Sequence, residues 1–287
     1  MGKYVIITDS SADLTKEIIN DPDLIAVQLD VLMEGEGAQA NCDVDIKEFY
    51  AKLRAKKNAT TSAVNIDTFL ATFEKHLAEG TDVLYLGFSS GLSGTYNAGL
   101  VAAKELADKY PERKVYALDT LAASLGQGLL VYYAVKMKNE GADIDSVRAF
   151  IEENKLHLCH WFTVDDLFFL KRGGRVNTAT AIVGSMLSIK PVLHVDNDGH
   201  LINVLKVRGR KTSVMTLADK YGELCDDDGN KIVYISHADC LAEAEELGRI
   251  INQKYGAETK LITNVGTVIG AHSGPGTIAL FFVGKER

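Results

Sequence analysis

Apolar runs and amphipathic segments alternate along the first half of the chain. Short, continuous apolar runs are typical of strands buried on both faces, and apolar residues at helical spacing are typical of the helices that cover such a sheet. The expected strands are 4–8, 25–33, 83–86 and 115–118, and the expected helices are 16–20, 45–57, 66–79, 98–109 and 124–141. This alternation predicts an α/β fold with a mostly parallel sheet and flanking helices.

The second half of the chain has a different order of elements. A turn signal at 196–199, between two extended runs, predicts a β-hairpin. The expected strands are 159–164, 190–194, 201–208, 231–237, 259–265 and 276–284, the expected helices are 145–155, 165–170, 179–186, 211–221 and 240–255, and 266–271 is a linker or the start of a helix. We therefore expect a mixed or antiparallel second sheet and two α/β domains, residues 1–157 and 158–287.

Composition narrows the class of protein. A net charge of −8 and a pI near 5.4 argue against a general nucleic-acid partner, which would need a basic face. The first apolar run is too short for a signal peptide, and no run approaches the roughly 18 residues of a membrane span, so we expect a cytoplasmic protein without stable membrane insertion. The four cysteines are scattered and form no C-x-x-C pair, which favours reduced thiols and no metal site.

A loop rich in glycine and hydroxyl groups, Gly87–Asn97, lies between a predicted strand and a predicted helix. Ligands bind at the carboxyl ends of strands in open α/β sheets, and the free N–H groups of a helix start favour an anionic oxygen. Gly94 lets the backbone approach a ligand closely, and Ser93 adds a hydroxyl donor. The segment therefore predicts a cradle for an anion or a carboxylate; the alternative is a loop that only caps its helix.

Two other polar loops precede helices. The hydroxyls of Thr61 and Ser62 could join the same cradle, although a capping role for Ser62 or Asn65 is equally natural. Asp9 and Asp13 follow the first strand and could hold Mg²⁺ with a phosphate, but we favour a role in ending the strand and capping.

Two glycine-rich segments carry basic residues. Lys171–Arg175 combines a helix C-cap with arginines that could contact an acidic ligand or partner, or simply end a solvated helix. Gly270–Gly276 holds His272 in a tight loop, where a functional role is favoured over a structural hydrogen bond.

Catalytic motifs are weak in this sequence. Ser93, His272 and Asp119 could form a triad, but Ser93 does not lie in a G-x-S-x-G elbow. The chain also lacks a Walker A lysine and a G-x-G-x-x-G fingerprint at this loop. The sequence thus favours binding over catalysis, with a Ser/His hydrolase of small acyl esters and a binding module for another small anion as alternatives.

Several of these motifs recur together in one known family. The chain resembles the DegV family, whose members act as fatty-acid-binding subunits of bacterial fatty acid kinase. The resemblance runs in order over essentially the whole chain and rests on Thr8–Leu14, Ser89–Tyr96, Asp119–Thr120, Val164–Leu167, Leu170–Arg175, Ile189–Pro191, Arg208–Lys211, Gly270–His272 and Gly274–Gly276.

The resemblance implies a long-chain fatty acid in a tunnel between two α/β domains, with no cofactor and no catalytic residue in this chain. The implied ligand-binding residues are Thr61, Ser62, Ser93, Gly94, His272 and Arg172. A separate ATP-dependent kinase subunit would dock at Arg208, Arg210 and Lys211 and form the acyl phosphate, and transient contact with a membrane is compatible with that role. Candidate tunnel-lining residues, which are equally natural as core, are Phe162, Phe168, Phe169, Ile182 and Met186.

One loop departs from the family pattern. The usual Thr-Ser-Gln-Pro-Ser is Thr61-Ser-Ala-Val-Asn65 in this chain, so an amide, a proline and a hydroxyl are absent. Thr61 and Ser62 remain, and several hydrogen bonds from such hydroxyls and helix N–H groups could offset the desolvation of a buried carboxylate. Burial of an acyl chain would contribute about 0.8 kcal/mol per CH₂.

Overall fold

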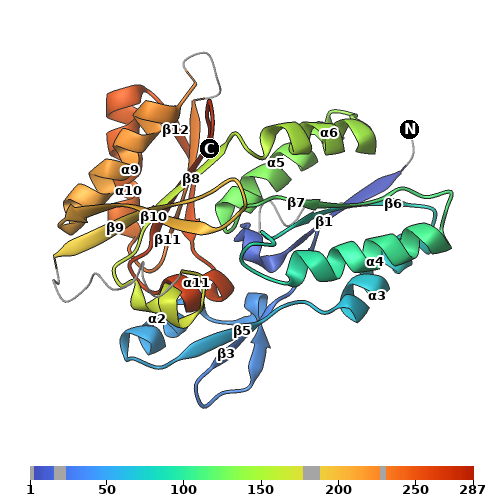
Figure 1. Cartoon of the computed structure of the whole chain (residues 1–287), viewed down its shortest axis with the longest axis horizontal. Coiled ribbons are helices and arrows are strands. Elements are labelled where there is room, and N and C mark those ends of the chain that lie inside the picture. The colour runs from blue at the N-terminus through green and yellow to red at the C-terminus, as the bar shows by residue number, and fades with distance from the viewer. Residues whose placement is uncertain (1–2, 16–23, 177–187, 227–230) are drawn as a thin grey trace.

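The computed structural model describes residues 3–15, 24–176, 188–226 and 231–287 (Figure 1). The helices expected over 16–20 and 179–186, and with them Ile182 and Met186, lie outside these ranges. The described residues form three sheets, with helices between and around them. The fold is mixed α/β, as predicted.

The first sheet is four-stranded and entirely parallel, in the order β2-β1-β6-β7. Side chains alternate across it. Val5, Ile7 and Tyr85 point toward α3 and α4, whereas Ile6 and Leu84 point toward α5 and α6, because successive residues of a strand face opposite sides. The bounds are β1 Tyr4–Asp9, β2 Leu24–Val27, β6 Asp82–Gly87, β7 Val115–Asp119, α3 Ile66–Ala78, α4 Thr95–Lys109, α5 Leu125–Asn139 and α6 Ile144–Asn154.

The second sheet is six-stranded and mixed, in the order β10-β9-β8-β13-β11-β12, and only its β11–β12 pair is parallel. The predicted hairpin is its β9–β10 pair. Helices α9 and α10 cover one face, and α5 packs on the other, so α5 lies between the two sheets (Figure 1). The bounds are β8 Leu158–Thr163, β9 Ile189–Val195, β10 Leu201–Arg208, β11 Ile232–His237, β12 Glu258–Asn264, β13 Ile278–Val283, α9 Arg210–Leu224 and α10 Leu241–Tyr255.

The third sheet is small and antiparallel, in the order β4-β3-β5, and was not predicted. The run 25–33 was expected to be one strand, but it divides into β2 and β3, which belong to different sheets. The segment Thr60–Ser62, expected as a loop, belongs to β5. In β3 and β5, buried or partly buried residues alternate with exposed ones, so only one face of the small sheet is apolar. The bounds are β3 Asp30–Met33, β4 Ala38–Ala40, β5 Ala59–Ser62 and α2 Ile46–Arg54, with short 3₁₀ helices η1 Ser10–Ala12 and η2 Asn41–Asp43.

The small sheet and α2 pack against residues from the C-terminal part of the chain. Phe49 and Tyr50 of α2 lie in one apolar cluster with Val265 and Ala271, and the Tyr50 hydroxyl donates to the carbonyl of Val265 at 2.6 Å. The short helices α7 (Phe168–Arg172) and α11 (Thr267–Ser273) lie beside this cluster. The proposed boundary between residues 157 and 158 falls just before β8, and it stays a prediction.

Candidate ligand-binding site

A cavity of about 150 Å³ lies where loops after the parallel strands meet α11 and the second sheet. This space is about ten times what one buried water needs. Its walls are mainly apolar. Of the three candidate tunnel residues that the structure describes, Phe162 lines the cavity, whereas Phe168 is exposed and Phe169 packs beside α2. The apolar lining includes Phe88, Leu92, Phe162, Leu170, Val268 and Ile269.

The mouth of the cavity brings together four of the six predicted ligand-binding residues. Thr61 comes from β5, Ser93 and Gly94 precede α4, and His272 lies near the end of α11. The Oγ1 of Thr61 and the Nε2 of His272 are 2.8 Å apart, and the Oγ of Ser93 accepts a hydrogen bond from the backbone N–H of Thr95. Thr61 and the hydroxyl-rich loop before α4, for which a shared cradle was one of the alternatives, therefore line one cavity.

The imidazole of His272 is neutral at pH 7. Burial lowers its pKa to about 4, and the positive charges of Arg175 and Arg172 lower it further in the same direction. Its Nδ1 has no hydrogen-bond partner among the described residues. The ring can therefore donate or accept one hydrogen bond at each nitrogen, and it supplies no fixed charge.

Arg175 lines the cavity and was not predicted as a site residue. Its Nε donates to the carbonyl of Leu92, and burial lowers the pKa of its guanidinium, which nevertheless remains a cation. Hydroxyl and backbone N–H donors were expected at the head of the site, with Arg172 as the expected cation. The motif Lys171–Arg175 did carry the signal, but it could not show which arginine faces inward.

Two predicted site residues do not line the cavity. Arg172 donates from Nη1 to the side-chain oxygen of Asn58, and its guanidinium lies 4.9 Å from the ring centre of Phe169. Ser62 is exposed, because it follows Thr61 on a strand and so faces the opposite side of β5. Neither residue is among those that line the cavity, and their part in binding stays a prediction.

The unusual loop after Thr61 has a structural explanation. Ala63 lines the cavity, Val64 is buried in the apolar cluster of α3 and α4, and Asn65 caps α3 by accepting from the backbone N–H of Thr68 at 2.8 Å. Capping was one of the two alternatives for Asn65, and it is the one found.

The triad suggested by residue types is not assembled. The Nε2 of His272 faces Thr61, and the hydroxyl of Ser93 lies 3.0 Å from that of Thr95. The carboxylate of Asp119 accepts from the backbone N–H groups of Leu121, at 2.9 Å, and Ser90. These contacts do not align an acid, a base and a nucleophile as such catalysis requires.

The inner end of the cavity is also polar. Ser124, Ser236 and His160 line it, and the Ser124 hydroxyl donates to the carboxyl of Asp13 at 2.6 Å. Burial raises the pKa of Asp13 to about 7, although the hydrogen bond from Ser124 acts in the opposite direction. Neither Ser124 nor Ser236 was predicted as a site residue, and the two lie far apart along the chain.

Asp9 has the capping role that was favoured for it. Its carboxylate accepts from the backbone N–H of Ser11, from the hydroxyl of Tyr85 at 2.9 Å and from the backbone N–H of Phe88 at 3.0 Å. Burial raises its pKa in spite of these hydrogen bonds. Asp9 thus fixes the ends of two neighbouring strands, β1 and β6, from which the loops of the site begin.

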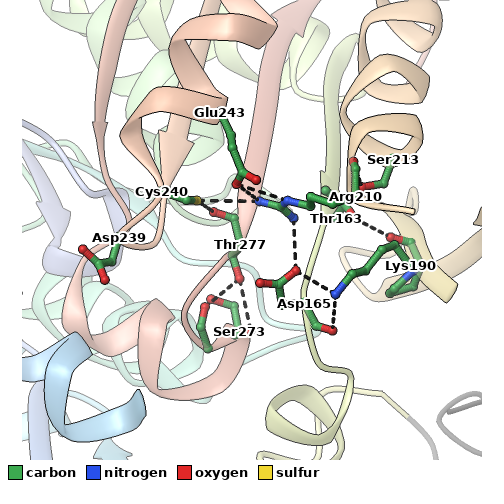
Figure 2. Close-up of polar contacts among 12 residues, drawn as sticks. Thr163, Asp165, Lys190, Arg210, Ser213, Asp239, Cys240, Glu243, Ser273 and Thr277 are labelled. Carbon is green, nitrogen blue, oxygen red and sulfur yellow. Dashed lines mark hydrogen bonds and ion pairs between the residues drawn. The ribbon is translucent and has the colours of Figure 1, made fainter. Parts of the chain in front are cut away.

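Among the three predicted partner-binding residues, Arg210 is engaged inside the fold (Figure 2). Its guanidinium lies 2.8 Å from a carboxylate oxygen of Glu243 and 3.7 Å from one of Asp165, which also pairs with Lys190 at 2.8 Å. Arg208 and Lys211 are exposed. The basic segment therefore divides into one structural residue and two that a partner can reach.

The ion pairs of Arg210 lie behind the loop that follows His272. In that loop the Thr277 hydroxyl donates to the carbonyls of Ser273 and Gly274 (Figure 2). Gly274 and Gly276 have positive φ angles of 77° and 83°, which glycine adopts readily. A Cβ at Gly276 would collide with the carboxylate of Asp165, so the ion-pair cluster packs directly on the loop that positions His272.

The parallel and mixed sheets share a helix layer and enclose an apolar cavity with a polar mouth, an arrangement typical of α/β proteins that bind small ligands. Residues 3–285 match the model of the DegV family of uncharacterised proteins. A DegV domain-containing protein from Clostridium perfringens is 45% identical, over 100% of this chain and 99% of the relative. The chain belongs to the DegV family.

Solved structures of DegV proteins share the whole fold. A DegV lipid-binding protein from Thermotoga maritima has a TM-score of 0.84 and 32% identity, covering 99% of each chain. A fatty-acid-binding DegV protein from Thermus thermophilus has a TM-score of 0.86 and 29% identity, covering 97% of this chain and 98% of its own. None of the helices in the described part of the chain is long and apolar enough to cross a membrane.

Proposed function

We propose that this protein binds a long-chain fatty acid in its cavity and presents the carboxylate to a separate ATP-dependent kinase subunit, which forms the acyl phosphate. The chain itself would carry the substrate and take no catalytic part. The role would be exercised in the cytoplasm, with the acyl chain enclosed between the N-terminal and C-terminal α/β domains.

The observation that carries the proposal is the division of the cavity into an apolar body and a polar mouth. Thr61, Ser93 and the backbone at Gly94 offer donors for a carboxylate, and His272 can add one from its neutral ring. Arg175 contributes a positive charge nearby. Apolar walls suit the tail, because each buried CH₂ contributes about 0.8 kcal/mol. The DegV relatives that bind lipid or fatty acid support the same choice of ligand.

The test is a comparison of stearic acid with stearyl alcohol, which shares the tail but lacks the carboxylate. We expect Thr61→Val and Ser93→Ala each to weaken binding of the acid about tenfold, since a hydrogen bond to a charged group contributes about 1.5–3 kcal/mol, and to affect the alcohol less. Native mass spectrometry of the purified protein should also show a bound acyl ligand.

Ser213→Ala is the matched control, because Ser213 is a buried serine that bonds to the carbonyl of Arg210 and does not line the cavity. Equal losses for acid and alcohol would reject the carboxylate role. Failure of the unmodified protein to bind any long-chain acid would reject the function as a whole.

Kinase presentation has its own test. A purified fatty acid kinase subunit with ATP should yield acyl phosphate only when this protein is present and loaded. Arg208 and Lys211, exposed beside the engaged Arg210, are the residues we propose for docking, so the double variant Arg208→Ala/Lys211→Ala should slow turnover without changing the Kd for stearic acid. Unchanged turnover would move the docking surface elsewhere.

A further inference from the structure

The inner end of the cavity has hydrogen-bonding groups where a plain acyl chain has none. Ser124 and Ser236 are both buried, both line the cavity, and their hydroxyl oxygens lie 3.1 Å apart. Hydroxyl groups buried there no longer form hydrogen bonds to water, and a neighbouring CH₂ group of an acyl chain cannot replace those hydrogen bonds. The arrangement therefore suits a ligand that carries a polar group of its own at this depth.

The direction of the hydrogen bonds leaves an acceptor free. Ser124 donates its single proton to Asp13, so the proton between the two serines comes from Ser236. Ser236 therefore keeps lone pairs with which it can accept from a ligand hydroxyl. A hydroxyl bound there would extend a chain that runs through Ser236 and Ser124 to the carboxyl of Asp13, and such chains strengthen their members cooperatively.

A second polar side chain borders the cavity from a nearby strand. The buried ring of His160 lines the cavity, whereas its Nδ1 is enclosed beside Gly126 of α5 and has no hydrogen-bond partner within the described ranges. It faces the same side of the sheet as Ser236, because Phe281 pairs with His160 while Ala279, two residues earlier, pairs with Ser236.

The distance between the two polar ends follows from α11, whose residues Val268, Ile269 and His272 line the cavity wall. At its start Gly266 packs on Asp13, and near its end His272 contacts Thr61. The six residue-to-residue steps from Gly266 to His272 span roughly 9 Å at about 1.5 Å per residue. An extended chain advances about 1.2 Å per single bond, so the inner polar groups lie about seven or eight bonds from the mouth.

We infer that this site takes long-chain acids with a hydroxyl group near the middle of the chain, held by Ser236 beside the ring of His160, in preference to the unsubstituted acid. The inference rests on the proposed function, since it places the carboxylate at Thr61 and Ser93. It names the class of acid that the same cavity selects.

The experiment measures the Kd of delipidated protein for stearic acid and for a positional series of hydroxystearic acids. A hydroxyl near the middle of the chain should bind about five- to tenfold tighter than stearic acid, because a buried hydrogen bond has a net worth of that order. A hydroxyl beside the carboxylate or at the methyl end should bring no gain. Ser236→Ala should remove the preference for the mid-chain hydroxystearic acid over stearic acid, and Ser213→Ala should preserve it.

The outcomes separate this inference from the function on which it rests. If stearic acid binds and the mid-chain hydroxystearic acids bind equally or more weakly, the inference is overturned and the function stands. If the preference persists in Ser236→Ala, the assignment of the inner site is wrong. If no acid binds to the unmodified protein, both proposals fail.

Discussion

The two polar ends of the cavity are built in different ways. At the mouth, Thr61, Ser93 and His272 are partly exposed and come from three separate segments of the chain. At the inner end, Ser124 and Ser236 are fully enclosed and connect to a buried carboxyl group, that of Asp13. Polar side chains at the partly exposed mouth can serve binding at little cost in the free energy of unfolding. Polar side chains at the enclosed inner end lower the free energy of unfolding, because they are removed from water.

The largest expected effect concerns Asp13, which is only 8% exposed. Its pKa is raised from 3.8 to about 7 in the folded protein, so the folded state binds its proton more tightly than the unfolded state. Stability therefore falls as pH rises from about 4 to 7. The total is on the order of 4 kcal/mol at about 1.4 kcal/mol per pKa unit.

Asp13→Asn should remove this loss, and its φ of 51° is one that asparagine tolerates. Urea unfolding at pH 4 and at pH 8 measures the difference, which should shrink in the variant. Burial also raises the pKa of Asp9, and its charge acts on Asp13, so Asp9 accounts for the pH dependence that remains. An identical pH dependence in both proteins would contradict the prediction.

A smaller effect is expected at the mouth from Gly173→Ala. The φ of Gly173 is −70°, so the backbone accepts alanine, but a Cβ there would collide with Nδ1 of His272. Displacement of the ring from Thr61 should weaken binding of stearic acid about tenfold or more, roughly the loss of one hydrogen bond to a charged group. Gly37→Ala, where the Cβ meets nothing within 4 Å, is the control. Retained affinity would show that the position of His272 does not matter.

The smallest effect concerns Arg210, behind the mouth. Arg210→Met should lower the free energy of unfolding by about 1–2 kcal/mol, because Asp165 and Glu243 lose their partner but remain partly exposed to water. Arg208→Met, on the exposed strand β10, should change it by less than about 0.5 kcal/mol. Chemical denaturation of the two variants measures the contrast, and equal values would mean that the ion pairs of Arg210 do not stabilise the fold.

Periodicity predicted the regular parts of the fold because burial on both faces leaves a clear pattern. The parallel sheet, α3, α5 and the β9–β10 hairpin were expected within a few residues. The small sheet was missed because β2 and β3 form one apolar run, and the change of sheet at Gln28 and Leu29 depends on contacts with distant residues. Thr60–Ser62 was similarly assigned to a loop because polar side chains hide a strand that is buried on one face only.

Chemistry near the mouth was easier to predict than chemistry at depth. Ser93, Gly94, Thr61 and His272 lie in glycine-rich or hydroxyl-rich segments that stand out in the sequence, and they line the cavity. Which of the two arginines, Arg172 or Arg175, lines the cavity depends on how the chain turns after α7. No local pattern marks Ser124 or Ser236. The role of a single serine in an apolar segment depends on the hydrogen-bond partner that the fold brings to it, and that partner is distant in sequence.

Helix α5 is enclosed along most of its length, with Gly126 so close to the second sheet that a Cβ would lie 3.0 Å from the ring of Phe281. Hinging the two sheets apart would bring the apolar surface of this helix into contact with water, at about 25 cal/mol for each Å² exposed. A ligand would therefore enter the cavity end-on while the two sheets stay packed on α5. The rates of ligand entry and release should depend on the small segments at the cavity mouth and hardly at all on relative motion of the sheets.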